Sequence, residues 1–241
     1  MDEWLEFFNA DVLLKKGQYA EAVASFDRVI KVNPKNESAW CGRGIALNRL
    51  GRHTDAVASY DRAIEIYPEY ASAYYGRGIA YDELERHEDA VTSFDMAIGI
   101  DSNDTDTWYS RGIALGKLGL YTDAVESYER AIEIDPKHIY AWNNRALALY
   151  ELGRCDESLE SYERVIEIDP KHIYAWNNRG LALASLGRYD ESLESYERAI
   201  EINPKDADAW INRGKALADL GHHADALTSY NRAIEINPKD A

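Results

Sequence analysis

The sequence predicts an all-α protein made of tandem helix pairs, and two observations support this prediction. An aromatic residue recurs at intervals of 34 residues, at Trp40, Tyr74, Trp108, Trp142, Trp176 and Trp210. The segments 139–172 and 173–206 share 27 of 34 residues, and both begin with Ile-Tyr-Ala-Trp-Asn-Asn-Arg. A fixed period of this length is typical of structural units that stack side by side along one axis.

The recurring aromatic residue, taken as position 4, divides the chain into seven repeats. They span residues 3–36, 37–70, 71–104, 105–138, 139–172, 173–206 and 207–240. Because each unit of such an array contacts its neighbours, residues 3–240 are expected to form a single domain.

Each repeat is expected to contain two helices joined by a tight turn. Positions 4, 8 and 11 share one helical face, because they follow the i, i+4, i+7 spacing. A glycine at position 15, such as Gly51, can take the left-handed conformation that ends a helix. Hydroxyl or acidic residues such as Thr54 and Asp156 are expected to cap the second helix. A proline at position 32, such as Pro68, ends the repeat.

This pattern resembles the tetratricopeptide repeat. In the second repeat it is carried by Trp40, Gly44, Leu47, Gly51, Ala56, Tyr60, Ala63 and Pro68. The resemblance covers residues 3–240 and implies a right-handed α-α superhelix, a solenoid of antiparallel helix pairs. It places the first helices on a concave groove and the second helices on the convex face.

Two repeats depart from the pattern. The first has Glu6 at the position of the recurring aromatic residue, and terminal repeats are often atypical. The third has Glu85 in place of the turn glycine, Gly99 inside its second helix and Ser102 in place of proline. The boundary between the third and fourth repeats is therefore expected to differ in curvature or mobility.

Composition narrows the class of protein. The formal net charge of −16 argues against nucleic acid as a partner, because binding to phosphates relies on Lys and Arg. The acidic N-terminus does not resemble a secretion signal, and no apolar stretch approaches the length of a membrane span. Only two cysteines occur, Cys41 and Cys155, which indicates reduced thiols and a cytoplasmic location.

The sequence contains no recognisable catalytic or metal-binding constellation. The histidines fall at fixed turn positions of the repeat, and a metal site normally needs three or four converging ligands. The acidic run at 101–106 lacks the glycine and the bidentate glutamate of a calcium loop. We therefore expect a protein without enzymatic activity, metal or cofactor.

The resemblance places positions 2, 5, 6, 9, 12 and 13 on the groove. Position 9 is an apolar stripe made of Ile45, Ile79, Ile113, Leu147 and Leu181. Exposed apolar surface of this extent usually marks a contact site. The alternative is that these side chains lean into the core between repeats.

Position 6 divides the groove into two halves. It is small in the N-terminal half, at Gly42, Gly76 and Ser110, beside aromatic residues that suggest a shallow trough. In the C-terminal half it is asparagine, and a row of amides can pair with successive peptide units of an extended chain. The residues expected to bind a peptide are Tyr75, Tyr109, Tyr140, Asn143, Asn144, Leu147, Tyr174, Asn177, Asn178, Leu181 and Asn212.

Charged residues also follow the repeat. An arginine at position 7, from Arg43 to Arg213, is expected to lie between repeats and to pair with carboxylates such as Asp61 or Glu129. The alternative is a basic ladder that binds an anion. Acidic residues concentrate on the second helices, where they are expected to form a solvated convex face.

These observations favour a protein-interaction scaffold that holds a peptide or protein segment in its groove. An alternative is a structural protein that self-assembles through its terminal repeats, because the last repeat, 207–240, has no capping helix after it. A further alternative is the interaction domain of a larger protein.

Overall fold

The computed structural model describes residues 3–238, and every regular element in this range is an α-helix. The prediction of an all-α fold is confirmed. The chain divides into two compact units, Met1–Ile134 and Asp135–Ala241.

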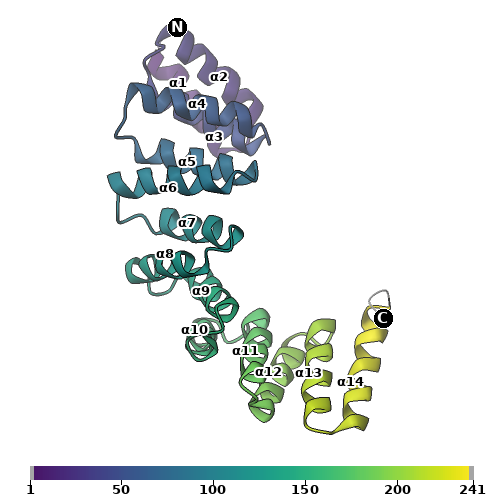
Figure 1. The fold of residues 1–241 in the computed structure, drawn as a ribbon. Helices are drawn as coiled ribbons and strands as arrows, with labels where there is room; N and C mark the ends of the chain where they lie inside the picture. Colours follow the sequence, from purple (N-terminus) through teal and green to yellow (C-terminus); the bar gives the residue numbers. More distant parts are fainter. Residues whose placement is uncertain (1–2, 239–241) are drawn as a thin grey trace. The chain divides into compact units, whose positions relative to one another are not determined.

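The first unit contains eight helices, and consecutive helices pack against each other (Figure 1). They are α1 (Glu3–Lys15), α2 (Tyr19–Val32), α3 (Glu37–Arg49), α4 (His53–Ile66), α5 (Ala71–Glu83), α6 (His87–Ile100), α7 (Thr105–Lys117) and α8 (Tyr121–Ile134). Odd-numbered helices are the first helices of their repeats, and even-numbered helices are the second.

The second unit contains six helices in the same alternation (Figure 1). They are α9 (Ile139–Glu151), α10 (Cys155–Ile168), α11 (Ile173–Ser185), α12 (Tyr189–Ile202), α13 (Ala207–Asp219) and α14 (His223–Ile236). Each first helix begins at the first residue of a predicted repeat.

In six repeats the turn between the two helices contains the predicted glycine in the left-handed conformation. The prediction that Thr54 and Asp156 cap the second helices is wrong. Gly51 has φ +74°, and the Arg52 N–H bonds the Leu47 carbonyl at 2.9 Å. This turn brings the chain into α4 two residues earlier than a cap at Thr54 would, so Thr54 lies inside the first turn. The N-cap residue is Arg52, which instead pairs with Asp55, with Nε to Oδ2 at 2.8 Å.

The third repeat keeps this turn without the glycine. Glu85 has φ 58°, and the Arg86 N–H bonds the Tyr81 carbonyl at 2.9 Å. A side chain in the left-handed region is strained by roughly 1 kcal/mol per residue. We expect Glu85→Gly to raise the free energy of unfolding by about 1 kcal/mol, measured by urea denaturation. Gly119→Glu, at φ +73°, should lower it; equal stability of all three proteins would contradict this account.

In the second repeat, the aromatic ring at position 24 fits between glycines on neighbouring first helices. Tyr60 is 1% exposed and lies against Gly44 of its own repeat and Gly76 of the next. A Cβ on Gly44 would lie 2.7 Å from Tyr60 Cε1, and one on Gly76 would lie 2.5 Å from Tyr60 Cζ. Only residues without a side chain leave room for the ring at these two contacts.

The buried tyrosines at position 24, such as Tyr196, predict that the protein becomes less stable in alkaline solution. Burial raises the pKa of Tyr196 to about 12, whereas an unfolded tyrosine has a pKa of about 10. The unfolded chain therefore loses its proton first as the pH rises above about 10, and folding becomes less favourable up to about 12. Over that range Tyr196 should contribute a loss of about 1.4 kcal/mol per pH unit.

Tyr196→Phe should remove this contribution without a cavity, because Phe26 and Phe94 occupy the same repeat position. The measurement is the slope of the unfolding free energy against pH for both proteins. Identical slopes above about pH 10 would contradict the assignment.

Two polar contacts join successive repeats. The Trp40 indole donates to the Pro34 carbonyl at 3.0 Å, and the same bond links Trp108 to the carbonyl of Ser102 at 3.0 Å. The boundary between the third and fourth repeats therefore keeps this regular contact although Ser102 replaces the proline. Arg77 pairs with Asp61 at 2.8 Å, as predicted for the arginines at position 7.

Candidate peptide-binding groove

The first helices of each unit form a shared face. α3 contacts both α1 and α5, α5 contacts α7, and α11 contacts α13. Among residues 3–238, no two second helices contact each other to a similar extent. We call the face formed by the first helices the groove face; in the second unit it consists of α9, α11 and α13.

Tyr140 and Tyr174 are the most exposed tyrosines of the second-unit groove face, at 63% and 72%. Each ring lies edge-on to the histidine two residues before it, with centroids 6.3 Å apart. His138 Nδ1 accepts the Ala141 N–H at 3.0 Å, which caps α9 and anchors the imidazole; His172 caps α11 in the same way. The two phenols are thus held in equivalent positions one repeat apart.

The asparagines beside them are half-buried and bonded to one another or to the core. Asn212 Nδ2 donates to Asn177 Oδ1 at 3.1 Å, which joins α13 to α11. Asn178 hydrogen-bonds the Tyr162 hydroxyl, and Asn143 Nδ2 donates to Asn144 Oδ1 at 3.3 Å. These amides therefore help to hold the repeats together, a role that the sequence did not suggest.

One atom in this group lacks a partner. Among the described residues, Asn143 Oδ1 is the buried side-chain polar atom without a hydrogen bond. In the next repeat, the equivalent oxygen of Asn177 accepts a hydrogen bond from Asn212. The residue in the place of Asn212 for Asn143 is Asn178, but its side chain bonds the Tyr162 hydroxyl instead. A buried acceptor left unsatisfied costs about 1–3 kcal/mol. The duplicated repeats thus differ in their hydrogen bonds although their sequences are nearly the same.

The apolar stripe at position 9 is partly exposed. Ile45 is 38% exposed and Leu147 is 39% exposed, whereas Ile79, Ile113 and Leu181 are half-buried. Ile79 packs against the core around Phe94. The stripe is therefore exposed in some repeats and leans into the core in others.

The trough predicted in the first unit is not present as expected. A Cβ on Gly42 would lie 2.4 Å from the Phe26 ring, so this glycine is a packing position covered by the preceding repeat, as is Gly76. Tyr75 and Tyr109 are half-buried and lie against the aromatic rings at position 24 of their own repeats. Burial raises the pKa of Tyr75, whose hydroxyl bonds Ser110. In the second unit, Tyr140, Leu147 and Tyr174 of the groove face are exposed.

Sequence reasoning missed one contact and one surface. The Tyr150 hydroxyl lies 3.1 Å from Ser185 Oγ and joins α9 to α11 on the groove face. Tyr150 is at position 12 of its repeat, which the resemblance places on the groove, so the sequence already indicated that it lies on this face. The second is a pocket around Trp176 on the opposite side of α11; the acidic bias of the second helices was the signal for it.

Within residues 3–238, no three or more His, Cys, Asp and Glu side chains are grouped so as to hold a metal ion. In the same range, no helix combines the length and the apolar character that crossing a bilayer requires. Both cysteines are free thiols, Cys41 buried and Cys155 partly exposed.

Comparison with protein families decides the relationship suggested by the repeat. A family model described as tetratricopeptide repeat matches residues 9–71 and 109–173. Related models of the same repeat match 59–92, 161–194, 180–221 and 207–240. The chain belongs to the tetratricopeptide repeat (TPR) family. No curated protein matches it.

Solved structures of other TPR proteins are similar to this one. YrrB, described as a TPR protein with an unusual peptide-binding site, is 29% identical with a TM-score of 0.70, and the match covers 76% of this chain and 95% of YrrB. A TPR protein fragment from Cytophaga hutchinsonii has a TM-score of 0.84 at 17% identity and covers 97% and 96%. MamA from Desulfovibrio magneticus has a TM-score of 0.67 at 21% identity and covers 71% and 97%. The latter two support the fold alone.

Proposed function

We propose that this TPR protein is a non-catalytic scaffold that binds an extended segment of another protein on its second-unit groove face. The observation that carries the proposal is the pair of exposed phenols, Tyr140 and Tyr174, held one repeat apart by capping histidines. Rigid, exposed tyrosines provide large contact area at low cost in conformational entropy.

The chemistry of this face favours a ligand with apolar side chains. Leu147 is exposed between the two tyrosines in sequence, and Leu181 is half-buried at the equivalent position of the next repeat. The phenol hydroxyls of Tyr140 and Tyr174 can bond the ligand backbone while their rings contact its side chains. The likeness to YrrB, whose own site is described as peptide-binding, supports the same use here.

The amides set the register of the bound segment. Asn143 Oδ1 is a buried acceptor without a hydrogen-bond partner. A peptide N–H that bonds it removes the cost of an unsatisfied buried group, so this bond gains more free energy than one to an acceptor that water already satisfies. The neighbouring row Asn144, Asn178 and Asn212 provides one further amide in each of three successive repeats.

The test uses peptides selected from a random phage-displayed library on the immobilised full chain. Asn144→Ala/Asn178→Ala/Asn212→Ala should weaken a selected peptide about tenfold, because each amide contact is worth about 0.5–1.5 kcal/mol. Circular dichroism must show an unchanged helix content. Equal affinity of the triple variant for every selected peptide would sink the role of the amides.

Self-association is a second candidate, supported by an apolar patch on α1. Trp4 is 70% exposed and stacks on Phe8 at 5.7 Å, and Leu5 beside them is 51% exposed. Exposed aromatic clusters of this kind are typical of contact sites. Light scattering over a concentration series should show a mass that rises in the wild type but not in Trp4→Ser/Phe8→Ser. A constant monomer mass in both proteins would remove this candidate.

A further inference from the structure

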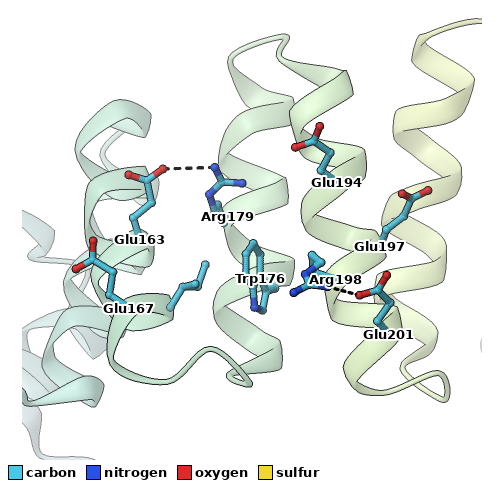
Figure 2. A pocket seen from close by; sticks show the side chains of 9 residues that line it. Glu163, Glu167, Trp176, Arg179, Glu194, Glu197, Arg198 and Glu201 are labelled. Atoms are coloured by element: carbon cyan, nitrogen blue, oxygen red, sulfur yellow. Dashed lines mark hydrogen bonds and ion pairs between the residues drawn. The ribbon is translucent and has the colours of Figure 1, made fainter.

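The exposed side of α6 differs from that of the other second helices. Five of these helices carry an arginine and a glutamate three residues apart, and the two side chains form an ion pair. The pairs are Arg62–Glu65, Arg130–Glu133, Arg164–Glu167, Arg198–Glu201 and Arg232–Glu235. Figure 2 shows one of them, Arg198–Glu201 on α12, beside Trp176. In α6 the same two positions are occupied by Met96 and Gly99.

Met96 and its neighbours form an uncharged, exposed stripe on α6. Thr92, Met96, Gly99 and Ile100 follow the i, i+4, i+7, i+8 spacing and therefore share one helical face. Met96 is 47% exposed and Ile100 is 39% exposed, and Thr92 and Gly99 are exposed as well. Exposed apolar side chains that lie together usually mark a contact site. We call these four residues the α6 stripe.

The packing of the chain itself does not explain Gly99. Glycine inside a helix lowers the stability of the helix relative to alanine. Gly44 and Gly76 are required, because an aromatic ring lies against each of them, but a Cβ built on Gly99 has no atom within 4 Å. No side chain among the described residues therefore requires a glycine here. A helix of another molecule that packs on α6 could approach most closely at this residue, because it has no side chain.

The end of the α6 stripe carries negative charge that the protein does not neutralise. Asp101 directly follows Ile100, and Asp101 and Asp104 both line a cavity of about 280 Å³ at the end of α6. Within residues 3–238 neither carboxylate forms an ion pair; Asp101 accepts the Asn103 N–H at 3.0 Å, and Asp104 accepts the Thr107 hydroxyl. The free carbonyls at the C-terminus of α6 add a partial negative charge. A basic residue placed just beyond the stripe would therefore be attracted.

We infer that the α6 stripe binds an amphipathic helix of a partner protein, with an apolar face and a lysine or arginine just beyond it. The apolar face would pack on Met96 and Ile100 with one of its side chains over Gly99, and the basic residue would reach Asp101. A second copy of this chain fits less well, because each copy has a formal net charge of −16. The stripe lies in the first unit, so the inference does not rest on the proposed function.

The test uses a fluorescein-labelled helical peptide with leucines on one face and lysines on the other. Its anisotropy is recorded while the full chain is added at physiological salt, which screens general attraction by the acidic protein. Met96→Arg/Gly99→Glu gives α6 the ion pair of the other second helices and leaves the net charge unchanged. We expect this variant to bind the peptide at least about tenfold more weakly. Its midpoint of urea denaturation should rise, because glutamate is a better helix former than glycine, so unfolding cannot explain the loss.

Charge-matched controls separate the stripe from the rest of the acidic surface. Arg130→Glu/Glu133→Arg reverses the ion pair on α8 and should change the affinity less than about twofold. Asp101→Asn should weaken binding about threefold, whereas Asp123→Asn, the same change at an exposed residue of α8, should leave the affinity unchanged.

Four results would each overturn the inference. They are an absence of binding by the wild type, full affinity of Met96→Arg/Gly99→Glu, an equal loss in Arg130→Glu/Glu133→Arg, and equal effects of Asp101→Asn and Asp123→Asn. The groove variant Tyr140→Ala/Tyr174→Ala should bind this peptide like the wild type. Loss of binding in that variant would place the peptide on the groove face and would overturn the inference as well.

Discussion

Gly76→Ala is expected to lower the free energy of unfolding by about 2 kcal/mol, the cost typical of overpacking a core. The added Cβ would lie 2.5 Å from Tyr60 Cζ and 2.6 Å from Cε1. The ring cannot move away, because Gly44 holds its other side and Tyr60 is 1% exposed. The measurement is the midpoint of urea denaturation followed by circular dichroism.

A second glycine in a neighbouring helix provides the matched control. Gly99 lies in α6, and a Cβ built on it has no atom within 4 Å. Gly99→Ala should therefore raise stability by up to about 1 kcal/mol, because alanine is a better helix former. If both substitutions shifted the midpoint in the same direction, packing between Gly76 and Tyr60 would not explain the loss.

The double variant Tyr140→Ala/Tyr174→Ala is expected to bind a library-selected peptide at least about 30-fold more weakly than the wild type. Aromatic anchors of an interface typically cost 2 kcal/mol or more when truncated. The free energy of unfolding should change by less than about 0.5 kcal/mol per residue, because both side chains are largely exposed. Isothermal titration calorimetry measures the affinity, and urea denaturation measures the stability.

Tyr67→Ala is the control for this loss. Tyr67 is 46% exposed and follows α4, away from the groove face. It should leave the affinity unchanged. Retention of full affinity by the Tyr140 and Tyr174 double variant, or an equal loss in Tyr67→Ala, would exclude the two phenols as the anchors of the ligand.

The repeat made most of the fold predictable from the sequence. The spacing of Trp40 and its equivalents placed the start of every first helix correctly, and the family comparison confirmed the relationship. The caps were predicted less well. Thr54 and Asp156 have suitable side chains, but the left-handed glycine turn before them sets where the helix begins. Local geometry therefore overrode residue preference.

The groove was harder to predict, because a position number does not reveal what covers a side chain. Gly42 and Gly76 suggested an open trough, yet each lies under an aromatic ring of the preceding repeat. Tyr140 and Tyr174, which the resemblance placed on the groove, are largely exposed, whereas Tyr75 and Tyr109 are half-buried. Sequence thus located the face, whereas packing decided which of its residues are accessible.

The most direct test of binding on the groove face is the NMR spectrum of the side-chain amides. A ¹⁵N-labelled full chain is titrated with a library-selected peptide, and the amide signals are assigned by single substitution to aspartate. Our account predicts that Asn143, Asn144, Asn177, Asn178 and Asn212 shift together while Asn33 and Asn36 in the first unit do not. Binding that leaves those five signals unchanged would contradict the account.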